Sequence, residues 1–200
     1  CVGRRSIDEV TRLDWRRVLL DRVPWRLRAL LDEEVPQPEL RLTLRIDGLG
    51  QQRALELELG EPLAALRTFN ELLWYRRQRP EPGVSPKDWA VSLARLWTQG
   101  ANDAGRLNES VLVRSCAQRA LDVLKPFFDG TPTSNVAAEH ACALLFHAIA
   151  RTNLGEPVEG RQEAQQALAI LEVQVPLQGQ ARPELGQLLA FGRHYFPSSS

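Results

Sequence analysis

The feature that most constrains the fold is a pair of long apolar stripes at helical spacing, joined by a short turn. Residues 107–128 carry apolar side chains every three or four positions, and residues 134–154 do the same. This period places the apolar side chains on one face of a helix. Between the two stretches, Asp129-Gly130-Thr131-Pro132 has the composition of a turn. The pattern therefore predicts two antiparallel helices packed through their apolar faces.

Further helices are predicted on both sides of this pair. Ser85 and Pro86 are typical of a helix start, and Gly155 is typical of a helix end. Residues 100–106 are expected to form a loop. The additional predicted helices cover residues 6–21, 25–32, 61–79, 86–100, 156–173 and 183–196.

The segment 39–59 has a different period. Its leucines alternate with polar residues on both sides of Asp47-Gly48-Leu49-Gly50, which is a turn signal. This alternation predicts a β-hairpin, in which Arg41 and Arg45 face glutamates of the second strand. Because an isolated hairpin is marginal in water, its leucine face should cover a helix of the same chain. Alternatively, its free edges accept a strand from another protein.

Together these patterns predict a mainly α-helical fold, either a helical bundle or a short α-solenoid, with one embedded β-hairpin. We divide the chain into four parts. Residues 1–5 form an anchor or linker, residues 6–100 a helical region with the hairpin, and residues 101–197 a helical-hairpin region; residues 198–200 form a disordered tail.

Charge and hydropathy argue against two classes of protein. The 25 basic and 25 acidic residues cancel, so no overall field draws the chain to nucleic acid. The longest apolar run, residues 141–150, is about half as long as a membrane-spanning helix and contains His147. We therefore expect neither a nucleic-acid partner nor a transmembrane segment.

The first residues carry a resemblance. The chain begins with Cys1-Val2-Gly3 and contains no methionine. This start resembles the mature end of a bacterial lipoprotein, whose first cysteine carries lipid. The resemblance implies a cleaved signal peptide, lipidation of Cys1 and, because Val2 replaces the aspartate that favours inner-membrane retention, the periplasmic face of the outer membrane. The alternative is an excised fragment that happens to begin at cysteine.

Residues 141–171 resemble a tetratricopeptide helix pair. The spacing of the small and apolar residues matches the 34-residue pattern at Leu144, Ala148, Leu154-Gly155, Gly160 and Ala167. Three residues depart from the family pattern, namely His147, Arg151 and Ala164, which replace apolar or aromatic residues. The resemblance implies a protein-binding α-solenoid, in which stacked helix pairs form a concave surface. A coincidental helical hairpin is the alternative.

The two remaining cysteines are candidates for a disulfide. Cys116 and Cys142 lie at equal distances from the turn at Asp129-Gly130, so antiparallel helices would bring them to the same level. An oxidising periplasm would favour the bond, which would stabilise the fold by about 3 to 4 kcal/mol. The alternative is two reduced thiols packed in the core.

No motif for catalysis, metal binding or cofactor binding is found in the sequence. His140 and His147 lie on one helical face without a third ligand, which indicates structural histidines. Phosphate loops, dinucleotide fingerprints and the Gly-x-Ser-x-Gly motif are absent from the sequence. We therefore expect a protein that is not an enzyme, without metal or cofactor.

The expected function is protein binding. Three tryptophans, Trp74, Trp89 and Trp97, are expected in the core. The residues expected to contact a partner are Trp15, Trp25, Arg41, Arg45, Arg76, Arg77 and Arg79. The sequence predicts a membrane-anchored periplasmic scaffold or assembly factor for a cell-envelope complex, such as secretion, pilus or cell-wall machinery. The alternatives are an interaction domain excised from a larger cytoplasmic protein and, less in keeping with the motifs, a cofactor-free enzyme.

Overall fold

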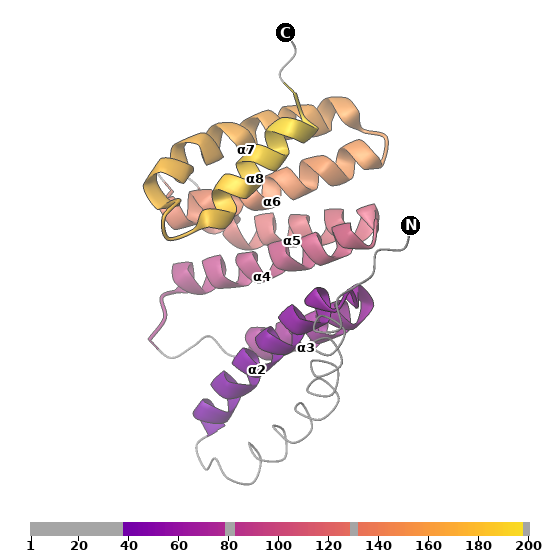
Figure 1. Ribbon diagram of the computed structural model, residues 1–200. Coiled ribbons are helices and arrows are strands. Elements are labelled where there is room, and N and C mark those ends of the chain that lie inside the picture. Colours follow the sequence, from indigo (N-terminus) through magenta and orange to yellow (C-terminus); the bar gives the residue numbers. More distant parts are fainter. Residues whose placement is uncertain (1–37, 79–82, 129–131, 198–200) are drawn as a thin grey trace. The chain divides into compact units, whose positions relative to one another are not determined.

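The computed structural model describes residues 38–78, 83–128 and 132–197, and within these ranges every regular element is a helix (Figure 1). The chain divides into two compact units between Arg79 and Pro80. The N-terminal unit contains α2 (Pro38–Glu58) and α3 (Pro62–Gln78). The C-terminal unit contains α4 (Pro86–Arg106), α5 (Ser110–Phe128), α6 (Ser134–Asn153), α7 (Pro157–Gln178) and α8 (Pro183–Tyr195). The helices predicted over 6–21 and 25–32 and the tail 198–200 lie outside the described residues.

The β-hairpin predicted for residues 39–59 is wrong, because α2 covers almost the whole segment. Among the side chains of α2 that the structure describes, residues 44–58, the buried ones are those of Ile46, Leu49, Arg53 and Glu56, whose spacing of three and four is helical. Leucine, arginine, glutamine and glutamate, which dominate the segment, are all good helix formers. The same segment therefore satisfies both a two-residue period and a helical period, and it forms a helix in spite of the turn signal at residues 47–50.

The N-terminal unit is a helix pair in which α2 packs against α3. Gln52 Nε2 of α2 donates to Thr68 Oγ1 of α3 at 3.3 Å and to Glu56 Oε1 of its own helix at 2.8 Å. Arg45 Nη1 donates to Tyr75 Oη at 2.8 Å. Arg45 therefore binds within the helix pair and not to a glutamate of a second strand. Gly60, with φ +74°, ends α2 in the left-handed conformation that glycine adopts without strain.

The helices predicted in the C-terminal half are present, and two of them are longer than expected. Ser85 Oγ accepts a hydrogen bond from the Asp88 backbone N–H at 3.1 Å, and Pro86 is the first residue of α4, as predicted. However, α4 continues through the expected loop 100–106, because Ala101 and Ala104 extend its buried stripe. In α7, the side chain of Gln178 donates to Ser134 Oγ of α6 at 2.6 Å, which holds the turn beyond Val173.

In the C-terminal unit the helices alternate in direction, so α4, α6 and α8 run one way and α5 and α7 run the other (Figure 1). The central helix is α6, which packs against α4, α5, α7 and α8. Most of its side chains are buried, and many are alanines that let the neighbouring helices approach closely. One apolar cluster joins α6 to α7 and α8, and another joins α6 to α4 and α5.

Helices α6 and α7 approach each other closely at Gly160 of α7. A Cβ atom there would lie 2.8 Å from the carbonyl oxygen of Ala148 and 2.4 Å from Oγ1 of Thr152, both on α6. Only a residue without a side chain is accommodated at this distance. The small residues at 148 and 160, singled out from the sequence spacing, therefore face each other where α6 and α7 meet.

Candidate functional site

The C-terminal unit contains a groove with a volume of about 1140 Å³. Its walls come from α4, α6 and α8, the three helices that share one direction, and from the α4–α5 connection together with the first turn of α5. These helices are not consecutive in the sequence. The groove therefore exists only because α5 and α7 return the chain, so that every second helix faces the same side.

One end of the groove is closed by a cluster of charged side chains. Glu139 of α6 has a side chain that is 2% exposed, and its Oε1 atom lies 2.8 Å from both Arg95 Nε of α4 and Arg182 Nη2. Arg182, at the start of α8, also forms an ion pair with Glu184 at 2.8 Å. The cluster joins all three walls of the groove, so it fixes their positions at this end.

The ionisation of this cluster follows from its contacts. Burial lowers the pKa of Arg182, but Glu139 and Glu184 outweigh that effect and raise it above its usual value. Burial likewise raises the pKa of Glu184, whereas the hydrogen bond from Arg182 lowers it, and the net shift is downward. Both groups are therefore charged at neutral pH. The Nη1 atom of Arg182 is buried without a hydrogen-bond partner among the described residues.

The remaining polar lining consists largely of side-chain amides. They belong to Gln99, Asn102, Asn108, Asn153 and Gln187. An amide side chain both donates and accepts hydrogen bonds, as a peptide backbone does. Tyr195 Oη donates to Asn153 Oδ1 at 2.6 Å, which orients that amide at the end of the groove opposite the charged cluster.

Apolar side chains line the floor and the α8 wall of the groove. They are those of Phe146, Ile149, Leu188, Phe191 and Tyr195. Phe191 is 46% exposed, and its ring centroid lies 5.9 Å from that of Tyr195. An aromatic side chain exposed inside a groove provides apolar area to a bound molecule without a large cost in side-chain entropy.

The thiols of Cys116 and Cys142 are both buried and both free in the structure. Burial, with a contribution from Asp103, raises the pKa of Cys116 to about 11. Burial, with a further contribution from Glu139, raises the pKa of Cys142, which lines the groove, to about 12. The acidic residue that affects each thiol is thus a different one, Asp103 for Cys116 and Glu139 for Cys142. The disulfide between the two cysteines stays a prediction.

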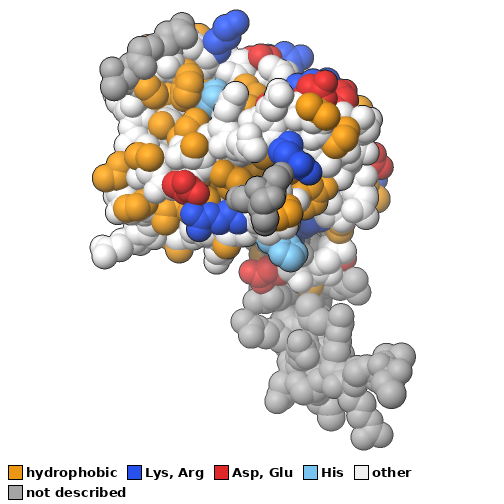
Figure 2. Space-filling view, turned by 90° about the horizontal axis from the view of Figure 1, so that it is seen from above, with side chains coloured by type: hydrophobic (Ala, Val, Ile, Leu, Met, Phe, Trp, Pro, Cys, Tyr) orange, Lys and Arg blue, Asp and Glu red, His pale blue; other side chains and the backbone are white. Residues whose placement is uncertain are grey.

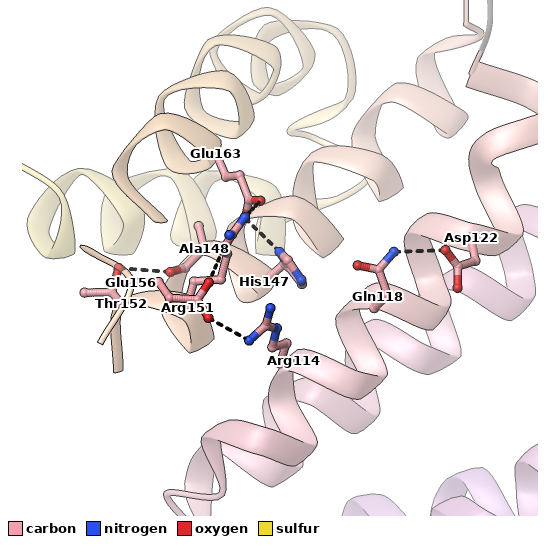
Figure 3. Close-up of polar contacts among 9 residues, drawn as sticks. All are labelled: Arg114, Gln118, Asp122, His147, Ala148, Arg151, Thr152, Glu156 and Glu163. Atoms are coloured by element: carbon pink, nitrogen blue, oxygen red, sulfur yellow. Dashed lines mark hydrogen bonds and ion pairs between the residues drawn. The ribbon is translucent and has the colours of Figure 1, made fainter. Parts of the chain in front are cut away.

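A second polar network joins α5, α6 and α7, and none of its members lines the groove (Figure 3). Arg151 donates from Nη1 to Glu163 Oε1 and from Nε to Glu156 Oε2, both at 2.7 Å. His147 Nδ1 lies 2.7 Å from Glu163 Oε2, and Arg114 Nη1 donates to Glu156 Oε1 at 2.9 Å. The hydrogen bond from Arg151 lowers the pKa of Glu156. We conclude that this network is structural.

The network accounts for the two polar residues of α6 at positions 147 and 151. His147 and Arg151 stand where that pattern has apolar or aromatic residues, and both bind acidic side chains. In each case Glu163 of α7 supplies an oxygen. The polar substitutions in α6 are thus matched by a carboxylate on the helix that packs against it.

The other histidine singled out from the sequence, His140, is stacked on Phe128 with ring centroids 3.7 Å apart. Burial lowers its pKa to about 4, so the ring is neutral at pH 7. Across residues 38–78, 83–128 and 132–197, no three His, Cys, Asp or Glu side chains gather in a geometry that could hold a metal ion.

Among the residues predicted to contact a partner, none that the structure describes lines the groove. Trp15, Trp25, Arg79 and the side chain of Arg41 lie outside the described residues, as does Cys1, the predicted lipidation site. Arg45 binds Tyr75, and Arg76 and Arg77 lie in the last turn of α3. All of these belong to the N-terminal unit, whereas the groove belongs to the C-terminal one.

The tryptophan prediction is only partly correct. Trp74, which was expected in the core, is 57% exposed on α3. Trp89 and Trp97 are half-buried, and Trp97 packs against the cluster shared by α4, α5 and α6. The apolar stripe of α3 is instead completed by Phe69, Leu72 and Leu73, which are buried.

The surface of the C-terminal unit has no dominant charge on the face seen in Figure 2, where hydrophobic, basic and acidic side chains are interspersed. None of the helices that the structure describes combines the length and the apolar character that crossing a bilayer requires. No family model matches this chain, and no curated protein or solved structure is significantly similar to it.

Proposed function

We propose that the protein is a non-enzymatic scaffold that holds a segment of a partner protein in the groove formed by α4, α6 and α8. The observation that carries this proposal is the combination of size and lining. The groove, at about 1140 Å³, lies at the upper end of the range of about 300 to 1000 Å³ that is typical of small-molecule pockets, and its lining comes from α4, α6, α8 and the first turn of α5.

The lining supports a peptide as the occupant. Side-chain amides can pair with the N–H and C=O groups of a peptide backbone, and exposed aromatic side chains can pack against its apolar residues. The walls are helices held together by packed apolar clusters and by the Glu139 ion pairs. A rigid site of this kind loses little conformational freedom when it binds.

The location of the protein remains a separate proposal. A lipid on Cys1 and a place on the periplasmic face of the outer membrane would make the partner a component of a cell-envelope complex. Metabolic labelling with radioactive palmitate tests whether Cys1 carries lipid, and the Cys1→Ser variant, labelled in parallel, is the control. Labelling of the wild-type chain alone would support it, and equal absence of label from both chains would contradict it.

Site-specific photocrosslinking in cells that make the protein tests the binding role. Benzoylphenylalanine would be placed at Asn102 or Gln187, which line the groove, and at Gln162 or Gln166, which are exposed on α7 outside it. We expect the groove positions to give one discrete crosslinked protein and the α7 positions to give none. Crosslinking from α7 alone would refute the groove as the binding site.

A further inference from the structure

The charged groups of the groove do not balance. Three arginines, Arg95, Arg106 and Arg182, line it together with two glutamates, Glu139 and Glu184. Both glutamates are ion-paired with Arg95 or Arg182. One positive charge, that of Arg106, is therefore left over in the lining.

Arg106 is exposed in the last turn of α4 and has no ion-pair or hydrogen-bond partner within the described ranges. The groove residues near it in the sequence, Gly105, Asn108, Ser110 and Val113, are all uncharged. Its guanidinium group is thus available for a carboxylate, which arginine binds through two parallel hydrogen bonds.

A second unmet donor lies at the other charged position of the lining. The buried Nη1 atom of Arg182 has no acceptor among the described residues. A buried N–H group of a charged side chain without a partner is costly, and the positive charge on this guanidinium group favours acidic groups in the groove beside it. Both unmet groups are hydrogen-bond donors on cations.

From these observations we propose that the segment bound in the groove is an extended acidic peptide that carries an aromatic or aliphatic residue next to a carboxylate. The proposal rests on the proposed function and specifies the partner. The carboxylate binds Arg106, and the neighbouring apolar side chain packs on Phe191 and Tyr195. Complementary charge gives the partner its specificity, because a basic segment would meet an uncompensated arginine.

The length of the bound segment follows from the helix geometry. Arg95 and Arg106 are eleven residues apart on α4, which corresponds to about 16 Å along a helix. An extended chain advances about 3.3 Å per residue, so about five residues span this distance. The groove therefore accommodates a short linear segment and does not require a folded partner domain.

The test is a selection of random dodecapeptides displayed on phage against the immobilised full-length chain. Enriched peptides would be synthesised with a fluorophore, and their Kd values measured by fluorescence polarisation. We expect enriched sequences to place Asp or Glu beside an aromatic or aliphatic residue. Three variants are compared with the wild type: Arg106→Glu, Phe191→Ser, and Arg161→Glu as a charge-matched control on the exposed face of α7 outside the groove.

Each outcome has one meaning. Arg106→Glu should weaken binding at least about tenfold, whereas Arg161→Glu should change it less than about twofold. If Phe191→Ser weakens binding but the two arginine variants behave alike, or if enriched peptides lack acidic residues, the acidic preference is refuted while groove binding stands. If no peptide is enriched, or if none of the variants affects binding, the proposed function fails as well. Circular dichroism of the variants, all altered at exposed positions, verifies that they are folded.

Discussion

Replacement of Gly160 by alanine tests the close packing of α6 and α7 on which the groove depends. The added Cβ atom would lie 2.8 Å from the Ala148 carbonyl oxygen and 2.4 Å from Thr152 Oγ1. Thr152 could turn away by giving up its 3.0 Å hydrogen bond to that same carbonyl. The carbonyl itself belongs to the backbone of α6, so relief requires that the two helices separate.

The expected magnitude comes from two opposing effects. Overpacking of this kind costs about 1 to 3 kcal/mol, whereas alanine in a helix interior is favoured over glycine by about 0.5 to 1 kcal/mol. The free energy of unfolding of Gly160→Ala should therefore fall by about 1 kcal/mol, within a range of about 0 to 2.5 kcal/mol. Urea denaturation followed by circular dichroism at 222 nm measures this change, with the m-value as a check on two-state unfolding.

Two other glycines provide matched controls. A Cβ atom at Gly186 of α8 meets nothing within 4 Å, so Gly186→Ala should raise the free energy of unfolding by about 0.5 to 1 kcal/mol. At Gly192, a Cβ atom would lie 2.8 and 2.9 Å from terminal methyl groups of Leu168 and Leu145, which can move. The free energy of unfolding of Gly192→Ala should therefore lie between those of Gly160→Ala and Gly186→Ala. If Gly160→Ala is as stable as Gly186→Ala, the close approach of α6 and α7 is wrong.

Three further predictions follow from buried polar groups. Glu139→Gln should lower the free energy of unfolding by about 2 kcal/mol, less than for a fully buried pair because Arg95 is 46% exposed; a change below about 0.5 kcal/mol in urea denaturation would contradict this role. Cys116 and Cys142, with pKa values of about 11 and 12, should not react with dithionitrobenzoate at pH 8 in the native protein. If the predicted disulfide forms, neither thiol should react with an alkylating reagent after the protein is unfolded without reductant. A mass increase that corresponds to alkylation of both cysteines would rule the bond out. His140 has a folded pKa of about 4, below its usual 6.5, so the folded state binds fewer protons and stability should fall by up to about 2 kcal/mol as the pH drops from 6.5 to 4; His140→Gln should reduce this slope, and an unchanged slope would exclude the histidine as its source.

The C-terminal helices could be predicted because their local signals agree. The structure confirms the helix starts that were predicted at Ser85-Pro86 and at Pro183. It also confirms the helix end predicted at Gly155, which has a φ of +91°. The error at residues 39–59 has the opposite origin. There the leucines satisfied a two-residue period and a helical period together, and the packing of α2 against α3 decided between them.

The groove could not be predicted, because its lining is scattered. Arg95, Glu139 and Arg182 are more than 40 residues apart from one another in sequence, and they meet only when α4, α6 and α8 lie on one side. Single arginines and glutamates on exposed helix faces give no signal in the sequence. Glu139, the one acidic residue of α6, was the signal that could have indicated a buried ion pair.

The most direct test of groove binding fills the groove itself. Asn102 and Gln166 are both exposed polar residues on helices, but only Asn102 lines the groove. The Kd of each variant for a peptide selected on the wild-type protein is measured by fluorescence polarisation. Asn102→Trp should raise this Kd at least about tenfold, and Gln166→Trp should leave it within about twofold of the wild-type value. Equal binding by the two variants would contradict the assignment of the groove as the partner site.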